Sequence, residues 1–164
     1  HFFFLGAAFL LIEVKGVTEL ALVWGTTWVV NTVVIAGILV LVLCANLFVA
    51  LVEPRRLCPY YLGLTLCLLA GYFFPVGDLL RYDWSIAAVS SAALLLTPLF
   101  FSGVIFAASL RRCRSVPEAF ASNLLGAILG GFAEYSAMAL GFRAMYGLAL
   151  ALYAASYAAL ARRR

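Results

Sequence analysis

Four charged side chains stand inside long apolar stretches of this 164-residue chain, and they are the residues best suited to chemistry: Glu13, Lys15, Glu19 and Glu134. Burying a lone charge in hydrocarbon costs about 2.5–3.5 kcal/mol even on insertion scales, so intramembrane charges are candidates for proton relays, cation sites or interhelical hydrogen bonds. Carboxamides in similar stretches can support them, and the sequence offers Asn31, Asn46 and Asn123.

The spacing of the first three charges predicts how they lie on a helix. At 100° per residue, Lys15 and Glu19 are four positions apart, share one face and can pair. Glu13 falls on the opposite face, roughly in line with Gly6, and has no partner in its own helix. Either another helix supplies a hydrogen-bond donor to Glu13, or this carboxyl is protonated. The first alternative is structural, and the second describes a proton or cation site.

Small and polar residues gather on one face of the stretch 119–140. Seven of them fall within about 60° to either side of one helix face: Asn123, Gly126, Ala127, Gly130, Glu134, Ala137 and Gly141. Gly126 and Gly130 form a GxxxG motif, which lets another helix backbone approach closely. We expect this face, with Gly126, Gly130 and Gly141 as packing positions, to contact a helix of this chain or of a partner.

Glu134 is the one carboxylate of that face, and its role has two readings. Arg143 follows just beyond the next turn and could reach back to form a structural ion pair with Glu134. The alternative is a role in transport or proton relay, because intramembrane carboxylates are functional candidates.

The surrounding stretches predict the elements that position these residues. Hydrophobic residues make up 66% of the chain and charged residues 11%, against about 25% charged residues in soluble domains. Strands of a membrane barrel would alternate apolar and polar residues over about ten positions, whereas these stretches are apolar for about twice that length. The sequence therefore predicts an all-α, polytopic transmembrane helix bundle of about six helices, at approximately 2–24, 28–52, 58–76, 86–110, 119–140 and 142–161.

Arginine placement predicts the orientation of the six crossings. The turns 53–56 and 111–118 and the C-terminus share one side, which holds Arg55, Arg56, Arg111, Arg112, Arg114, Arg162, Arg163 and Arg164. The other side holds Arg81 and Arg143. Basic loops stay cytoplasmic, so both ends of the chain are expected inside. The eight arginines are expected at anionic lipid headgroups, and the net charge of +4 therefore does not indicate nucleic-acid binding.

Other patterns limit the chemistry. The single histidine and the cysteines Cys44, Cys58, Cys67 and Cys113 form no CxxC pair or other metal-ligand spacing, and neither a metal nor a cofactor is expected. P-loop, HExxH and GxSxG motifs are lacking, so catalysis by these residues is not expected. Because the chain opens at His1 without a methionine, we expect 1–164 to be a single transmembrane domain belonging to a longer protein.

Three runs of residues resemble membrane regions of large bacterial spermidine-synthase-like proteins. They are residues 4–15 (FLGAAFLLIEVK), 25–31 (GTTWVVN) and 121–131 (ASNLLGAILGG). Proteins of that kind join a polytopic, transporter-like membrane part to a soluble methyltransferase-type fold. The resemblance implies the membrane portion of such a protein, in a bacterial cytoplasmic membrane, with aminopropyl- or methyl-transfer chemistry on the soluble domain. No catalytic aspartate or glycine-rich loop of that domain has a counterpart here.

Together these patterns favour a membrane-embedded scaffold or anchor that packs with other membrane subunits or with further domains of the same protein. The main alternative is half of a secondary transporter, because carriers are commonly built from repeats. A faint internal repeat exists: Leu5-Gly6-Ala7 precedes Glu13, and Leu125-Gly126-Ala127 precedes Glu134, with spacings that differ by one residue. A cavity lined by Glu13 or Glu134 would favour transport, and a solid core between their helices would favour a scaffold. A membrane-embedded enzyme is the third alternative.

Overall fold

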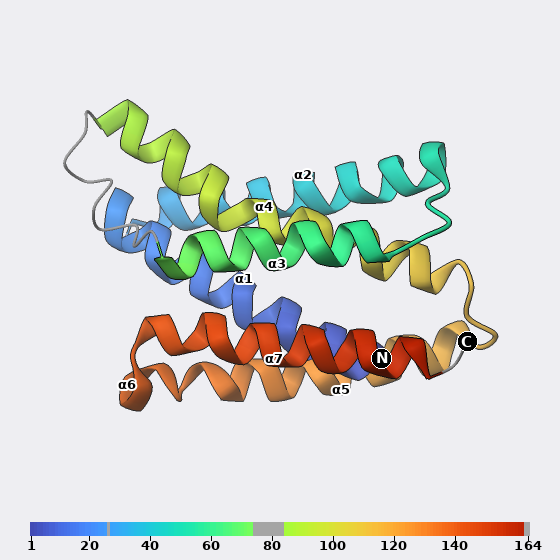
Figure 1. The fold of residues 1–164 in the computed structure, drawn as a ribbon. Helices are drawn as coiled ribbons and strands as arrows, with labels where there is room; N and C mark the ends of the chain where they lie inside the picture. The colour runs from blue at the N-terminus through green and yellow to red at the C-terminus, as the bar shows by residue number, and fades with distance from the viewer. Residues whose placement is uncertain (26, 74–83, 163–164) are drawn as a thin grey trace.

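The protein is a bundle of α-helices, as predicted (Figure 1). The computed structural model describes residues 1–25, 27–73 and 84–162, and none of them is in a β-strand. The helices are α1 (Phe2–Trp24), α2 (Trp28–Val52), α3 (Cys58–Phe73), α4 (Trp84–Leu110), α5 (Val116–Glu134), the one-turn α6 (Ala137–Leu140) and α7 (Phe142–Ala161). Four stretches are long and apolar enough to cross a membrane: Val30–Val52, Val89–Leu110, Val116–Leu140 and Phe142–Ala161.

Local signals explain the ends of α2, which begins and ends at the predicted residues. The side chain of Thr27 accepts a hydrogen bond from the Val30 N–H at 3.3 Å, so it caps one of the N–H groups that the first turn leaves unpaired. At the other end Glu53 adopts a left-handed backbone conformation with φ 47°. Pro54 follows it, and α2 ends here because a proline disfavours helical geometry in the residue before it. The predicted bounds of α1 and α7 are likewise observed.

The predicted segment 119–140 differs from the structure at both ends of α5. The helix starts earlier, at Val116, because Pro117 fits its first turn, where an N–H would have no intrahelical partner. The segment is interrupted after Glu134, where the Ser136 hydroxyl donates a hydrogen bond to the carbonyl of Ala133 at 2.5 Å. Residues 74–76 of the predicted segment 58–76 lie outside the described residues.

The most highly charged helix, α1, lies at the centre of the bundle. It contacts α5, α7, α4 and α2, and it passes between the pair α5 and α7 and the layer formed by α2, α3 and α4 (Figure 1). Neighbouring helices therefore cover most of its surface. This placement allows Glu13, Lys15 and Glu19 to lie in an apolar bundle, because intramembrane charges face the bundle interior rather than lipid.

The α1–α5 contact is a seam of backbone against backbone. A Cβ atom added to Gly126 would lie 1.9 Å from the carbonyl oxygen of Phe3, and one added to Gly130 would lie 2.2 Å from that of Ala7. Both contacts advance by four residues on each helix, so the two helices run parallel. The GxxxG face therefore packs within this chain, and no side chain fits between the two backbones at these points.

The seam is nearly symmetric about the crossing point of the two helices. A Cβ atom on Gly6 would lie 2.0 Å from the carbonyl oxygen of Asn123, which mirrors the approach of Gly126 to Phe3. The matching residues are 120 positions apart, which is also the spacing between Leu5-Gly6-Ala7 and Leu125-Gly126-Ala127. The faint repeat in the sequence thus corresponds to two half-sites of one helix–helix contact.

Gly141 does not belong to this packing face, which corrects the prediction. It is exposed, it has φ 80°, and no atom lies within 4 Å of the position of an added Cβ. Gly141 ends α6 and precedes α7. A positive φ suits glycine, so its role is to make the turn between two helices. The break in α5 after Glu134 moves Gly141 away from the seam.

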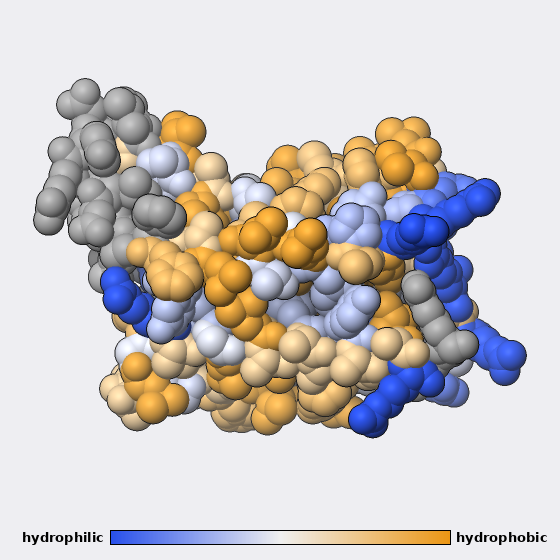
Figure 2. All heavy atoms as spheres, viewed as in Figure 1, coloured by the Kyte–Doolittle hydropathy of each residue, from blue (hydrophilic) through white to orange (hydrophobic). Residues whose placement is uncertain are grey.

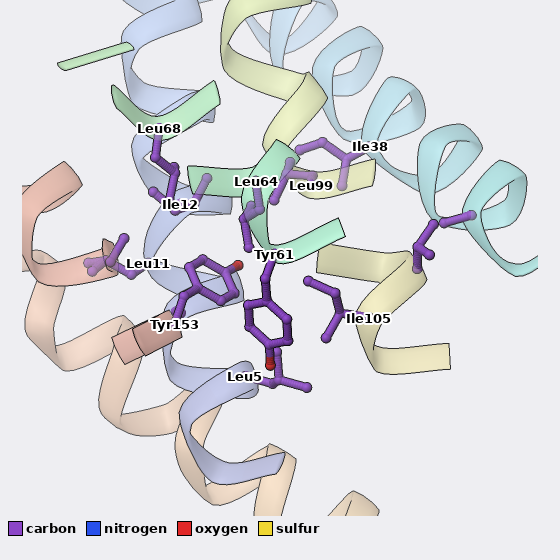
Figure 3. Close-up of a cluster of buried hydrophobic side chains, with 14 of the residues drawn as sticks. Leu5, Leu11, Ile12, Ile38, Tyr61, Leu64, Leu68, Leu99, Ile105 and Tyr153 are labelled. Carbon is purple, nitrogen blue, oxygen red and sulfur yellow. The ribbon is translucent and has the colours of Figure 1, made fainter. Parts of the chain in front are cut away.

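Apolar side chains from every long helix except α5 form one core beside the seam (Figure 3). Leu64 and Leu68 of α3 lie next to Ile12 of α1 there, and Tyr61 and Tyr153 lie close together near the centre. Large apolar side chains are also exposed on the outside of α2 and α5, including Leu51, which is 84% exposed, and Leu124, which is 63% exposed. Exposed apolar surface of this extent suits contact with lipid.

The seam predicts that alanine substitutions at different glycines change the free energy of unfolding by very different amounts. We expect Gly126→Ala and Gly130→Ala each to lower the free energy of unfolding by about 1–3 kcal/mol, because the added methyl forces the two backbones apart. Gly147→Ala on α7 is the matched control, since no atom lies within 4 Å of its Cβ position. Denaturant titration in detergent micelles measures the difference. Equal effects of all three substitutions would contradict the seam.

Candidate functional site

Lys15 and Glu19 form a buried ion pair within α1, as their spacing predicts. The Lys15 Nζ atom lies 2.6 Å from Oε1 of Glu19. Lys15 is only 2% exposed, and the Glu19 side chain is 16% exposed. Among the described residues, no further side-chain or backbone oxygen accepts a hydrogen bond from Nζ. The Glu19 carboxylate is therefore the main compensation for a buried ammonium group.

An aromatic ring from α7 completes this site. The Lys15 Nζ atom lies 3.6 Å from the centroid of the Tyr146 ring, a distance that suits a cation–π interaction. The Tyr146 hydroxyl donates to Oε2 of Glu19 at 3.5 Å. A Cβ atom on Gly71 of α3 would lie 2.5 Å from the same hydroxyl. Three helices thus converge on one Lys–Glu–Tyr cluster, and glycine at position 71 leaves space for the tyrosine.

The Lys15–Glu19–Tyr146 cluster is arranged for stability rather than for ligand exchange. The lysine ammonium already occupies the place beside Glu19 that an external cation would need. The tyrosine ring also contacts the ammonium, at 3.6 Å from its centroid. Buried ion pairs of this kind stabilise a fold weakly when complete, but losing one partner is costly. The cluster therefore connects α1 to α7 through charge and ring contacts.

Glu13 and Glu134 come to a similar depth, because the parallel register of the seam pairs residues about 120 positions apart. Within the described part of the chain, neither carboxylate forms an ion pair or a side-chain hydrogen bond. The predicted pair between Glu134 and Arg143 is not formed, and Arg143 is exposed at the start of α7. The break after Glu134 inserts an extra turn, α6, between the two residues.

The asparagines separate into different environments. Asn31 and Asn46 are exposed on α2, whereas Asn123 is half-buried on α5 at the seam. Asn46 and Asn123 both line one cavity of about 380 Å³. The structure therefore brings these two carboxamides to the same cavity, whereas Asn31 lies in the first turn of α2, away from it.

A network of hydroxyl groups joins the helices at the basic end, and sequence reasoning missed it. The Tyr61 hydroxyl and the Ser156 Oγ atom lie 2.9 Å apart, and Ser156 Oγ also lies 2.9 Å from Nδ1 of His1. The Nε2 atom of His1 is 3.0 Å from Oγ of Ser109. Tyr61 is only 7% exposed, so this hydroxyl is bonded within the core.

A heptad-like spacing on α7 would have indicated that network. Tyr146, Ala149, Tyr153 and Ser156 are separated by three, four and three residues, and all are buried. Such spacing marks one continuous helix face. The Tyr153 hydroxyl on this face donates to Oγ of Ser102 in α4 at 2.9 Å. The hydroxyl groups of Tyr146, Tyr153 and Ser156 are thus each paired with a partner outside α7.

Two arginines that directly follow α4 hold the turn between α2 and α3 in place. Arg111 donates to the Val49 carbonyl at 2.9 Å and pairs with Oε1 of Glu53 at 2.5 Å. Arg112 donates to the carbonyl of Arg55 at 3.1 Å. Hydrophilic residues gather at this end of the molecule, where both basic turns and the C-terminus lie (Figures 1 and 2). Four other arginines were predicted at this end and lie among the described residues, and all are exposed: Arg55, Arg56, Arg114 and Arg162.

Three of the arginines predicted at the membrane surfaces, Arg81, Arg163 and Arg164, lie outside the described residues. Among the residues that are described, no three His, Cys, Asp or Glu side chains come together as a metal site would require. No family model, curated protein or solved structure matches this chain. A function for it is therefore inferred from the geometry of the bundle.

The ion pair predicts a thermodynamic coupling. We expect Lys15→Met to lower the free energy of unfolding by about 3–5 kcal/mol, because it leaves the Glu19 carboxylate buried without its partner. The double variant Lys15→Met/Glu19→Met should be more stable than Lys15→Met alone. A double-mutant cycle in micelles measures this coupling, with the exposed Glu118→Gln as a control near zero. Additive effects of the two substitutions would argue against the pair.

Proposed function

We propose that this chain is a membrane-embedded scaffold or anchor module of a larger protein or complex. The observation that carries the proposal is the closed seam between α1 and α5, in which the backbones touch at Gly6, Gly126 and Gly130. A contact with no room for a side chain resists the relative motion of helices that alternating access requires. Such a core suits a module that holds its shape.

The paired charges of α1 and the positions of the cavities also support a scaffold. Lys15 and Glu19 neutralise each other, and neither Glu13 nor Glu134 lines any of the three cavities described here. A transporter needs a substrate site near the bilayer midplane. The helices that carry the carboxylates are joined by the seam instead, which favours the scaffold over the carrier.

The outer surface fits a fixed orientation in a bilayer. Apolar side chains on α2 and α5 would face lipid, and the end with the basic turns would face the cytoplasm, because arginine-rich loops are retained there. We further propose a bacterial cytoplasmic membrane, on the strength of the resemblance to spermidine-synthase-like membrane regions. On that reading a soluble aminopropyl- or methyltransferase-like domain of the same protein would be the part anchored.

Transport is the second candidate, and one observation favours it. Glu13 and Glu134 lie at a similar depth on two parallel helices, and neither has an ion-pair partner among the described residues. Two unpaired carboxylates at one level are a reasonable start for a proton or cation path. Such a path would still need a second half of the carrier, because no cavity described here reaches these side chains.

The anchor proposal predicts a defined topology. We expect green fluorescent protein fused after residue 162 to fluoresce, and alkaline phosphatase fused at the same place to be inactive, because that end is cytoplasmic. The fluorescent fusion should stay in the membrane pellet after alkaline carbonate extraction. Active alkaline phosphatase at this end would reverse the orientation, and release by carbonate would refute membrane anchoring.

A flux measurement separates the two candidates. We expect liposomes containing the purified chain to show the same proton and Na⁺ leak as empty liposomes, measured with entrapped pH- and Na⁺-sensitive dyes. Glu13→Gln and Glu134→Gln should leave the leak unchanged, with Glu118→Gln as the exposed control. A leak in the wild type that Glu134→Gln abolishes and Glu118→Gln preserves would establish transport and overturn the scaffold.

A further inference from the structure

Three neighbouring cavities follow one another along the side of the bundle, and we refer to them together as the groove. The first, of about 380 Å³, is mainly apolar and lies among α1, α2, α4 and α5. It shares Asn46, Ala107 and Leu110 with a second cavity of about 410 Å³. The second shares Val49 and Arg111 with a third of about 260 Å³. The shared residues show that the three cavities are adjacent, in an order that runs from the bundle interior to its basic end.

The two ends of the groove have opposite chemical character. Apolar side chains such as Leu5, Phe9 and Phe106 line its deep part. At its mouth the third cavity is lined by three arginines and one carboxylate, namely Arg55, Arg111, Arg112 and Glu53. These four residues carry a net charge of +2. A molecule that fills the groove must therefore be amphiphilic, with an apolar tail and an anionic head.

Two carboxamides lie along the apolar part at a matching depth. Asn46 is six residues before the end of α2, and Asn123 is seven residues after the start of α5, which places each about 10 Å below its basic helix end at 1.5 Å per residue. Among the described residues, neither carboxamide has a hydrogen-bond partner. Polar groups in hydrocarbon need partners, and the ester carbonyls of a glycerolipid lie just below its phosphate.

We propose that this groove binds one anionic glycerophospholipid of the surrounding bilayer. The phosphate lies beside Arg111 and Arg112 at the mouth, and one acyl chain follows the apolar wall formed by Ala107, Leu110 and Phe106. Asn46 and Asn123 donate to the ester carbonyls. Charge complementarity selects the anionic headgroup, because arginine binds phosphate through several N–H groups in a planar fork. Both terminal nitrogens of Arg111 already contact Val49 and Glu53, and both of Arg112 contact Arg55 and Pro54. The phosphate therefore accepts from the remaining N–H hydrogens of these two guanidinium groups.

The competing carboxylate provides a test of this assignment. Glu53 pairs with Arg111 at 2.5 Å, so it opposes a phosphate at the same guanidinium. Replacing Glu53 by glutamine removes one negative charge from the mouth without removing a donor. Glu53→Gln should therefore strengthen the binding of an anionic lipid, whereas a general loss of structure at the turn would weaken it.

The experiment measures lipid retention by the purified chain. Delipidated protein in detergent is titrated with phosphatidylglycerol or with zwitterionic phosphatidylcholine, and bound lipid is counted by native mass spectrometry. We expect one phosphatidylglycerol to bind at least fivefold more tightly than phosphatidylcholine. Arg111→Gln should weaken that binding about fivefold, the loss expected for one arginine near an anionic headgroup. Arg162→Gln, at the same end but outside the groove, should leave it unchanged.

A second variant tests the apolar part without touching the arginines. Ala50 is exposed and lines the second cavity, so Ala50→Phe should fill the groove and abolish the tightly bound lipid while the protein stays folded. Ala36→Phe makes the same change at an exposed position of α2 outside the cavities. Equal retention by Ala50→Phe and the wild type would overturn the proposal. Equal weakening by Arg111→Gln and Arg162→Gln would also overturn it, because it would indicate charge attraction without a site.

Discussion

The backbone contact between α1 and α5 determines the arrangement of the rest of the bundle. Gly6, Gly126 and Gly130 each face a carbonyl oxygen of the other helix, at a separation that no Cβ atom could occupy. Lipid supplies no hydrophobic force between helices, so close van der Waals packing of this kind is a main source of their association. Approaches this close also permit weak Cα–H···O contacts between helices. The remaining helices are placed around this pair.

The position of α1 explains how a charged helix exists in an apolar protein. Its contacts with α5, α7, α4 and α2 cover it on most sides, and its buried lysine is compensated by Glu19 and by the ring of Tyr146. The same helix takes part in the seam near its start and in the charged cluster nearer its end. Close backbone packing therefore holds the first half of α1 in place, and the charged cluster holds its second half.

Polar residues elsewhere divide according to their partners. Hydroxyl groups of α3, α4 and α7 pair with one another at the basic end, as Tyr61 does with Ser156 and Tyr153 with Ser102. Arg111 and Arg112, directly after α4, hold the turn that follows α2. Among the described residues, the carboxamides of Asn46 and Asn123 have no hydrogen-bond partner, and they line the groove that leads to those arginines. A bound lipid would complete this set of contacts.

The sequence alone was sufficient for the fold class, the bounds of α1, α2 and α7, and the pairing of Lys15 with Glu19. All of these depend on local rules: runs of apolar residues, capping signals, and the four-residue spacing of a helix face. The small-residue face of α5 could also be predicted, because the spacing of its glycines indicates where the backbone of another helix can approach.

Only the tertiary structure decided which helix meets that face, that Gly141 makes a turn, and that Tyr61 lies in the core. It also separated Glu134 from Arg143 and brought Asn46 and Asn123 to one cavity. Each of these depends on contacts between residues far apart in the chain. A residue's own neighbours in the sequence set its helix and its face, but the register and direction of packing depend on which other surface fits it most closely.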